Sequence, residues 1–83
     1  MSWDLLVTKP AKIELGRLPK RDQSRILLAL AEMQDNPFSG DIKRLTHAGW
    51  RRRVGNYRVL YDLLLEDHLI VVTAILRRTS TTY

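Results

Sequence analysis

Two runs typical of β-strands meet at a short turn in the stretch Trp50-Arg51-Arg52-Arg53-Val54-Gly55-Asn56-Tyr57-Arg58-Val59-Leu60-Tyr61-Asp62. Residues 50–54 alternate as a strand does, and Tyr57 to Leu64 reads as the returning strand. Between them, Gly55-Asn56 can supply the positive φ that a tight hairpin requires, at little steric cost. This stretch therefore predicts a β-hairpin.

The sequence on either side of the hairpin predicts further strands. Glu66-Asp67-His68 marks a second turn, and Leu69 to Leu76, which is rich in β-branched residues, predicts a third strand. Upstream, Phe38 to Gly49 has the composition of a loop, but Ile42 to Leu45 within it predicts a short strand. We expect these segments to form an antiparallel sheet of three to four strands.

The first half of the chain predicts one strand followed by two helices. Trp3 to Thr8 is a short apolar run, and Thr8 is placed to cap a helix that has Pro10 in its first turn. A second helix is expected from Pro19 to about Gln34, before Asp35-Asn36-Pro37 stops it. The apolar residues at helical spacing are Ala11, Leu15 and Leu18 in the first helix and Ile26, Leu27, Leu30 and Met33 in the second. The predicted class is α+β, with a helical hairpin packed on one sheet face in a single domain of residues 1–83.

Length and composition narrow the class of protein. A chain of 83 residues supports one small core, because chains this short bury only about 60% of the surface that their unfolded form exposes. Cysteine is absent, which excludes disulfides and thiolate chemistry and fits a reducing cytoplasm. The N-terminus has no leader-like pattern, and the longest apolar run is far shorter than the roughly 20 residues that span a bilayer. We therefore expect a soluble cytoplasmic protein that does not contact membranes.

Positive charge is concentrated in the middle of the chain. There are 14 Lys and Arg residues against 9 Asp and Glu, a net charge of +5. The segment that contains the hairpin has cations but no acidic residue among them: Lys43, Arg44, Arg51, Arg52, Arg53 and Arg58. Such a concentration is typical of a surface that binds a polyanion, although a solvated basic face is the alternative.

Strand geometry sorts these cations into faces. On residues 50–54, Arg51 and Arg53 project to one side, while Arg52 projects to the other with Trp50 and Val54. Arg58 on the returning strand is expected to face the same way as Arg51 and Arg53. Like charges on neighbouring strands repel, so this grouping favours a bound anion over a purely structural role. On the alternate face, Trp50, Tyr57 and Tyr61 are expected to be mainly packing residues.

Several other chemistries have no support in the sequence. His47 and His68 are isolated near predicted turns, without cysteines or paired carboxylates at the spacing of metal ligands. No glycine-rich phosphate loop opens a helix, and no nucleophile elbow is present. We therefore expect neither a metal site nor a cofactor.

The hairpin resembles the central hairpin of the RelE/ParE toxin superfamily. In that superfamily an aromatic residue, alternating basic residues, a Gly-Asp or Gly-Asn turn and a Tyr-Arg-hydrophobic-hydrophobic-Tyr strand follow in this order, as they do in residues 50–61. The resemblance covers essentially the whole chain, and its supporting matches are Leu18-Pro19-Lys20, Asn36-Pro37, Lys43-Arg44-Leu45, Arg77-Arg78 and Tyr83.

The resemblance implies the toxin of a type II toxin–antitoxin system, an endoribonuclease that enters the ribosomal A site, cuts messenger RNA and inhibits translation. It implies as catalytic residues Arg51, Arg53, Arg58, Arg77 and Tyr83. The other basic residues, expected to bind RNA or the ribosome, are Lys43, Arg44, Arg52 and Arg78. The implied partners are the ribosome with its messenger RNA and a cognate antitoxin, with which the chain would form a hetero-oligomer.

One departure from the family bears on the chemistry. Family members commonly have lysine at one or both positions of the pair that is Arg51 and Arg53 here. Because a guanidinium is a poor proton shuttle, we interpret both arginines as phosphate clamps. Two alternatives remain: a ParE-like inhibitor of DNA gyrase that performs no chemistry, and a basic module that binds structured RNA or only its antitoxin.

Overall fold

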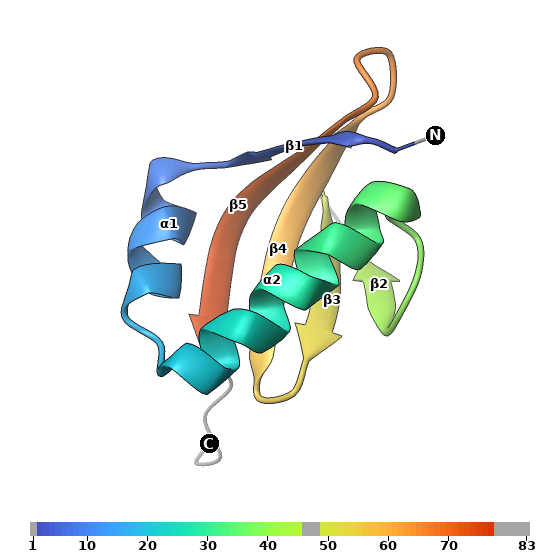
Figure 1. Ribbon diagram of the computed structural model, residues 1–83. Coiled ribbons are helices and arrows are strands. Elements are labelled where there is room, and N and C mark those ends of the chain that lie inside the picture. The colour runs from blue at the N-terminus through green and yellow to red at the C-terminus, as the bar shows by residue number, and fades with distance from the viewer. Residues whose placement is uncertain (1, 46–48, 78–83) are drawn as a thin grey trace.

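A computed structural model describes residues 2–45 and 49–77, and these residues form a helical layer packed on one face of a sheet (Figure 1). The elements in chain order are β1 (Asp4–Val7), α1 (Lys9–Gly16), α2 (Lys20–Asp35), β2 (Ile42–Arg44), β3 (Trp50–Val54), β4 (Tyr57–Leu64) and β5 (Leu69–Arg77). Neither helix is long and apolar enough to cross a membrane within this described part of the chain.

The sheet has five strands in the order β1-β5-β4-β3-β2. Strands β2 to β5 are antiparallel neighbours, which confirms the predicted meander and the α+β class. Strand β1 lies parallel to β5, with Leu5 opposite Ile70 and Val7 opposite Val72. The sheet is therefore mixed, a feature that the sequence did not predict, because a four-residue edge strand carries no local signal of its partner.

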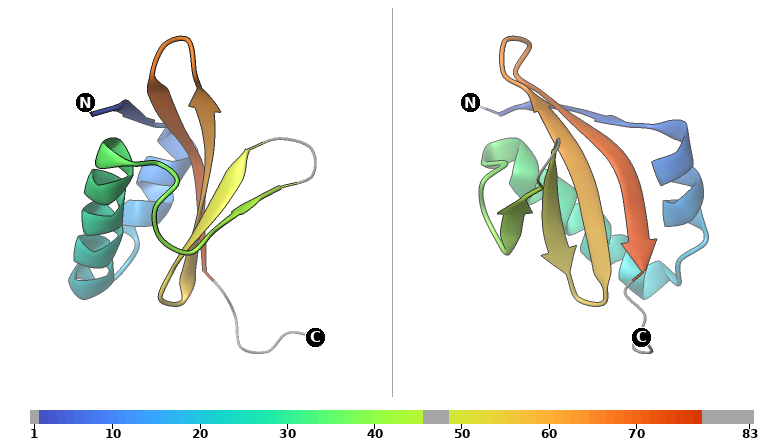
Figure 2. Two further views of the ribbon diagram at one scale, coloured as in Figure 1. Left: turned by 90° about the vertical axis from the view of Figure 1, so that its right-hand side faces the viewer. Right: turned by 180° about the vertical axis from the view of Figure 1, so that it is seen from behind.

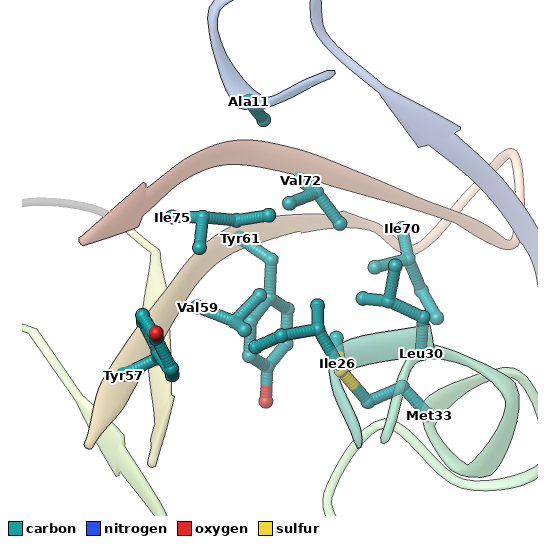
Figure 3. Packing of buried hydrophobic residues seen from close by; sticks show 10 residues of the cluster. All are labelled: Ala11, Ile26, Leu30, Met33, Tyr57, Val59, Tyr61, Ile70, Val72 and Ile75. Atoms are coloured by element: carbon teal, nitrogen blue, oxygen red, sulfur yellow. The ribbon is translucent and has the colours of Figure 1, made fainter. Parts of the chain in front are cut away.

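The core lies between α2 and the sheet. Figure 3 shows the buried side chains pointing toward one another from α1, α2, β4 and β5: Ala11, Ile26, Leu30, Met33, Tyr57, Val59, Tyr61, Ile70, Val72 and Ile75. The prediction that Leu27 belongs to this face is wrong, since Leu27 is 52% exposed while Ala29 is buried. Ile26, Leu30 and Met33 already define the buried stripe, and Leu27 lies about 100° around the helix from Ile26.

The start of α1 is held by the sheet rather than by its own cap. Thr8 occupies the N-cap position, but its side chain makes no capping hydrogen bond. Its hydroxyl instead donates to the carbonyl of Val72 at 2.9 Å. At the other end, the Gln23 side chain donates to the Leu18 carbonyl at 2.9 Å, which ties the start of α2 to the segment that follows α1. The first bond holds the start of α1 to β5, and the second joins the two helices to each other.

The predicted hairpin of β3 and β4 is confirmed. Val54 pairs with Tyr57, which leaves Gly55 and Asn56 as a two-residue connection. Gly55 has a φ of 59°, and Asn56 is not among the residues with positive φ. A positive φ at the first of two turn residues is the requirement of a type II′ turn, whose twist matches that of the flanking strands. The turn therefore fixes the register on which the face assignment depends.

Candidate functional site

The face of the sheet that the helices leave uncovered carries the paired arginines. Figure 2 shows both helices on one side of the sheet. Tyr57, Val59 and Tyr61 of β4 are buried on that side, so Arg58 between them projects to the open side. Arg53 pairs directly with Arg58 in the ladder between β3 and β4. Because side chains alternate along a strand, Arg51 lies on the same open side as Arg53.

A lysine extends this group by one strand. Lys43 of β2 pairs with Arg51 of β3, so their side chains project to the same face. We call Lys43, Arg51, Arg53 and Arg58 the basic face. Lys43, Arg53 and Arg58 are exposed and Arg51 is half-buried. Four cations from three adjacent strands thus share one accessible surface.

No member of the basic face forms an ion pair with another described residue. The ion pairs found in residues 2–45 and 49–77 join Arg17 to Glu14 and Arg52 to Glu32, and neither includes a member of the basic face. Arg53 and Arg58 stand directly opposite each other, an arrangement that destabilises a sheet when both side chains are charged. An external anion between them would turn this repulsion into attraction.

Arg52 faces the other way and is buried, with 7% of its surface exposed. Its guanidinium pairs with Glu32 of α2 and donates to the Ser39 hydroxyl at 3.3 Å and the Ala29 carbonyl at 3.4 Å. Gly40 makes room for it, since a Cβ there would come within 2.8 Å of the guanidinium carbon. The expectation that Arg52 binds RNA is therefore corrected: its donors are directed into the helix–sheet interface.

Arg44 also lies on the helical side of the sheet. It pairs with Trp50, and its guanidinium carbon lies 5.7 Å from the centroid of the Trp50 ring. The ring of Phe38 meets the same tryptophan edge-on, with centroids 5.3 Å apart. Trp50 is thus half-buried among its neighbours, in keeping with its interpretation as a packing residue. Of the two neighbours Lys43 and Arg44, only Lys43 belongs to the basic face.

Arg77 is separated from the basic face by its register. It pairs with Tyr57, which projects toward α2 and donates a hydrogen bond from its hydroxyl to Asp22 at 2.7 Å. That hydrogen bond raises the pKa of Tyr57, with burial and the negative charge of Asp22 adding to the effect, while the positive charge of Arg77 acts in the opposite direction. The structure thus brings Arg51, Arg53 and Arg58 together and places Arg77 beside Tyr57. Arg78, Tyr83 and His47 lie outside the described residues.

The open face also carries groups that the sequence analysis did not single out. Counting by two from Arg58 along β4 gives Leu60 and then Asp62 on the same side. Leu60 is half-buried and pairs with Arg51 on one side and Ala74 on the other. The same period-two count that grouped the arginines would have found Asp62.

This arrangement suits the binding of a phosphodiester. Guanidinium groups donate paired hydrogen bonds to phosphate oxygens, and clustered cations stabilise the charge that develops on a pentacoordinate phosphorus. In the described part of the chain no three His, Cys, Asp or Glu residues are grouped so as to hold a metal ion. The cations of the basic face can supply electrostatic stabilisation, and neighbouring side chains can supply proton transfer.

Comparisons with known proteins agree with this fold. The family model described as "ParE toxin of type II toxin-antitoxin system, parDE" matches residues 5–81. No curated protein matches the sequence significantly.

Several solved structures share the architecture. A chain of the toxin–antitoxin complex RelBE2 from Mycobacterium tuberculosis is 23% identical, with a TM-score of 0.84 over 94% of this chain and 100% of that one. A chain of the archaeal RelE–RelB complex from Pyrococcus horikoshii is 25% identical, with a TM-score of 0.84 over 98% and 100%. The isolated RelE toxin of E. coli is 17% identical, with a TM-score of 0.83 over 96% and 88%.

Proposed function

Because the chain belongs to the family of ParE toxins of type II toxin–antitoxin systems, we propose that it is a ribosome-dependent endoribonuclease, which cuts messenger RNA in the A site and inhibits translation. The observation that supports this proposal is the basic face. There Arg53 and Arg58 stand directly opposite each other, and Arg51 lies on the same side of β3, two residues before Arg53. Clustered cations of this kind can stabilise the charge that develops on a phosphorus atom during cleavage.

The proposed reaction uses the RNA's own 2′-hydroxyl as nucleophile. The 2′-oxygen attacks the adjacent phosphorus, the 5′-oxygen leaves, and the products are a 2′,3′-cyclic phosphate and a 5′-hydroxyl. Arg51, Arg53 and Arg58 bind the nonbridging oxygens, whose negative charge increases in the transition state. Since a guanidinium does not give up its proton at neutral pH, these arginines act as clamps and not as acids or bases.

The remaining implied residues have supporting roles in this proposal. Arg77 lies beside Tyr57 on the helical side of the sheet. We therefore assign Arg77 to the binding of flanking RNA, and not to the phosphate clamp formed by the arginines of the open face. Arg78 is assigned to the same RNA. The resemblance implies a catalytic role for Tyr83, and we propose that this role is to donate a proton to the leaving 5′-oxygen.

We also propose that the chain forms a hetero-oligomer with a cognate antitoxin. The mycobacterial and Pyrococcus structures that share its fold are both toxin–antitoxin complexes. The net charge of +5 favours an antitoxin with an acidic segment that covers the basic face, since complementary charge speeds and orients association. In this arrangement inhibition follows because the antitoxin and the RNA compete for one surface.

A second candidate function is inhibition of DNA gyrase. The family whose model matches the chain is named for ParE toxins, and this match favours the alternative that we drew from the resemblance. In such a protein the cations would bind an acidic protein surface or DNA and would leave translation intact.

One experiment separates the two candidates. The purified chain is added to a cell-free translation system, the 5′ ends of the message are mapped on stalled ribosomes, and gyrase supercoiling is measured in parallel. The proposal predicts new 5′ ends within the A-site codon, none on the same message without ribosomes, and unchanged supercoiling. Loss of supercoiling with intact message and unimpaired translation would reject the ribonuclease in favour of the gyrase inhibitor.

A further inference from the structure

The proposed cleavage needs a group that accepts the proton of the 2′-hydroxyl, and the four cations of the basic face do not supply one. Strand β4, which carries Arg58, also presents one carboxylate on the open face among the described residues, that of Asp62. Arg51 pairs with Leu60, and Asp62 follows Leu60 by two residues on the same side of the strand. Asp62 is therefore the diagonal neighbour of Arg51, within reach of a long side chain.

The position of the carboxylate is defined more closely by Gly49. Trp50 and Tyr61 form the last pair of the β3–β4 ladder, and Gly49 and Asp62 are the residues just beyond this pair. Gly49 has a φ of 84°, and a Cβ built on it would lie 2.6 Å from Oδ1 of Asp62 and 2.9 Å from the carbonyl oxygen of Tyr61. The carboxylate thus occupies the space that a side chain at position 49 would fill. A glycine is required there both for the backbone conformation and for this close approach.

This placement puts the carboxylate in line with the arginines of β3. Residues two apart on a strand are separated by about 6.6 Å and project to the same side. The carboxylate above Gly49 therefore lies about one such interval from the base of the Arg51 side chain. A nucleotide whose phosphate is held by Arg51 and Arg53 can then direct its 2′-hydroxyl, which is bonded to the same ribose, toward Asp62.

The other carboxylates that border this face are either farther from the arginines or more exposed than the half-buried Asp62. Asp4 belongs to β1, which is separated from β4 by β5. Asp41 lies opposite Arg53, whose amide donates a hydrogen bond to the Asp41 carbonyl at 2.9 Å, and it shares the open face with Lys43 two residues later. Its side chain is exposed. Asp41 therefore serves as a matched control for the chemistry of a carboxylate near the arginines.

We propose that Asp62 is the general base of the reaction, an assignment that rests on the proposed ribonuclease function. The carboxylate takes the proton from the 2′-hydroxyl as the bond between the 2′-oxygen and phosphorus forms. The bond between phosphorus and the 5′-oxygen breaks, and the leaving 5′-oxygen takes up one proton from the general acid of the proposed reaction, which regains a proton from water. Asp62 then releases its own proton to water. No oxidant, reductant or further reactant is consumed.

The test compares Asp62→Asn, Asp62→Glu and Asp41→Asn with the wild-type chain on messenger RNA held in ribosomal A sites. Cleavage is followed in single turnover, with toxin in excess, and ribosome binding is measured separately. Positioned general bases contribute about 10²- to 10⁴-fold, so Asp62→Asn is expected to slow cleavage at least about 100-fold while its ribosome affinity stays within about threefold. Asp41→Asn is expected to cleave within about threefold of wild type.

Two further readouts separate a base from a residue that only supports the sheet. With the carboxylate gone, hydroxide must take the 2′ proton, so the rate of Asp62→Asn is expected to rise about tenfold for each pH unit. Asp62→Glu keeps a carboxylate and is expected to recover at least tenfold over Asp62→Asn. Thermal unfolding of each variant confirms that the comparison is made on folded protein, and Asp62→Glu provides the comparison if Asp62→Asn does not fold.

The outcomes distinguish this assignment from the function on which it rests. If the wild-type chain cuts message and Asp62→Asn cuts it within threefold with the same pH dependence, Asp62 is not the base although the ribonuclease stands. Equal losses of cleavage and of ribosome binding in Asp62→Asn would also reject the base. If the wild-type chain cuts no message on ribosomes, the proposed function and this assignment both fail.

Discussion

Replacing Glu32 with glutamine tests whether the buried Arg52 belongs to the core or to the RNA surface. The Arg52 side chain is 9% exposed and the Glu32 side chain 53% exposed. The substitution keeps the shape of the partner but removes its charge, so the guanidinium keeps its weaker contacts with Ala29 and Ser39. The positive charge would then remain in the helix–sheet interface without a counterion.

The size of the effect follows from the exposure of the two partners. A hydrogen bond to a charged group contributes about 1.5–3 kcal/mol when it is shielded from water, and fully exposed pairs contribute about 0–1 kcal/mol. With one partner buried and the other half-exposed, we expect Glu32→Gln to lower the free energy of unfolding by about 1–2 kcal/mol. For a domain of this size each kcal/mol lowers Tm by about 4–8 °C.

The matched control is Glu14→Gln, because Glu14 pairs with Arg17 on the surface, where the two side chains are 46% and 71% exposed. That pair is expected to contribute less than about 0.5 kcal/mol. Urea unfolding of both variants and of the wild-type chain gives the comparison. Equal stabilities of Glu32→Gln and Glu14→Gln would show that the Arg52 pair does not hold α2 to the sheet. A loss of RNA binding by folded Glu32→Gln would return Arg52 to the functional surface.

Three further predictions follow from single contacts. Tyr61→Phe removes the donor that bonds to the buried Pro37 carbonyl at 2.8 Å, and urea unfolding should show a loss of about 1–2 kcal/mol; no loss would mean that water replaces the hydroxyl. Arg21→Glu, in the first turn of α2, should stabilise the chain by about 0.3–1 kcal/mol, because anions are favoured at a helix N-terminus; a lower Tm would contradict this reasoning. The raised pKa of Tyr57 should contribute stability that is present below the pKa of an unfolded tyrosine, about 10, and is lost as pH rises through the folded value. Tyr57→Phe should lose the part of the alkaline decline that comes from Tyr57 and keep the part from Tyr61, whose pKa burial also raises; identical alkaline unfolding of both proteins would argue against it.

The local sequence pattern, that is, turn residues and the alternation of apolar and polar residues, was sufficient to predict most of the fold. The hairpin was predictable because Gly55-Asn56 satisfies a turn that few other dipeptides allow, and because the alternation on either side of it fixes which residues face the core. The same alternation correctly placed Arg51, Arg53 and Arg58 on one face and Tyr57 and Tyr61 in the core.

The features that sequence missed depend on contacts between distant segments. The parallel pairing of β1 with β5 joins the two ends of the chain, and no residue in β1 specifies it. Leu27 has the same hydrophobic character as its buried neighbours, and only the position of the sheet decides that it is exposed. The burial of Arg52 likewise requires Glu32 and Gly40, which are remote in sequence.

The central claim is that the cations of the open sheet face carry out the function, and a double substitution tests it most directly. Arg53→Ala combined with Arg58→Ala is compared with the wild-type chain and with Arg17→Ala, which removes one positive charge from the helical side. In single-turnover cleavage of message in the A site, we expect the double variant to lose at least about 100-fold and Arg17→Ala to lose less than threefold. The double variant should be no less stable than wild type, since the two arginines repel each other across the ladder. Wild-type cleavage by a folded double variant would contradict the claim.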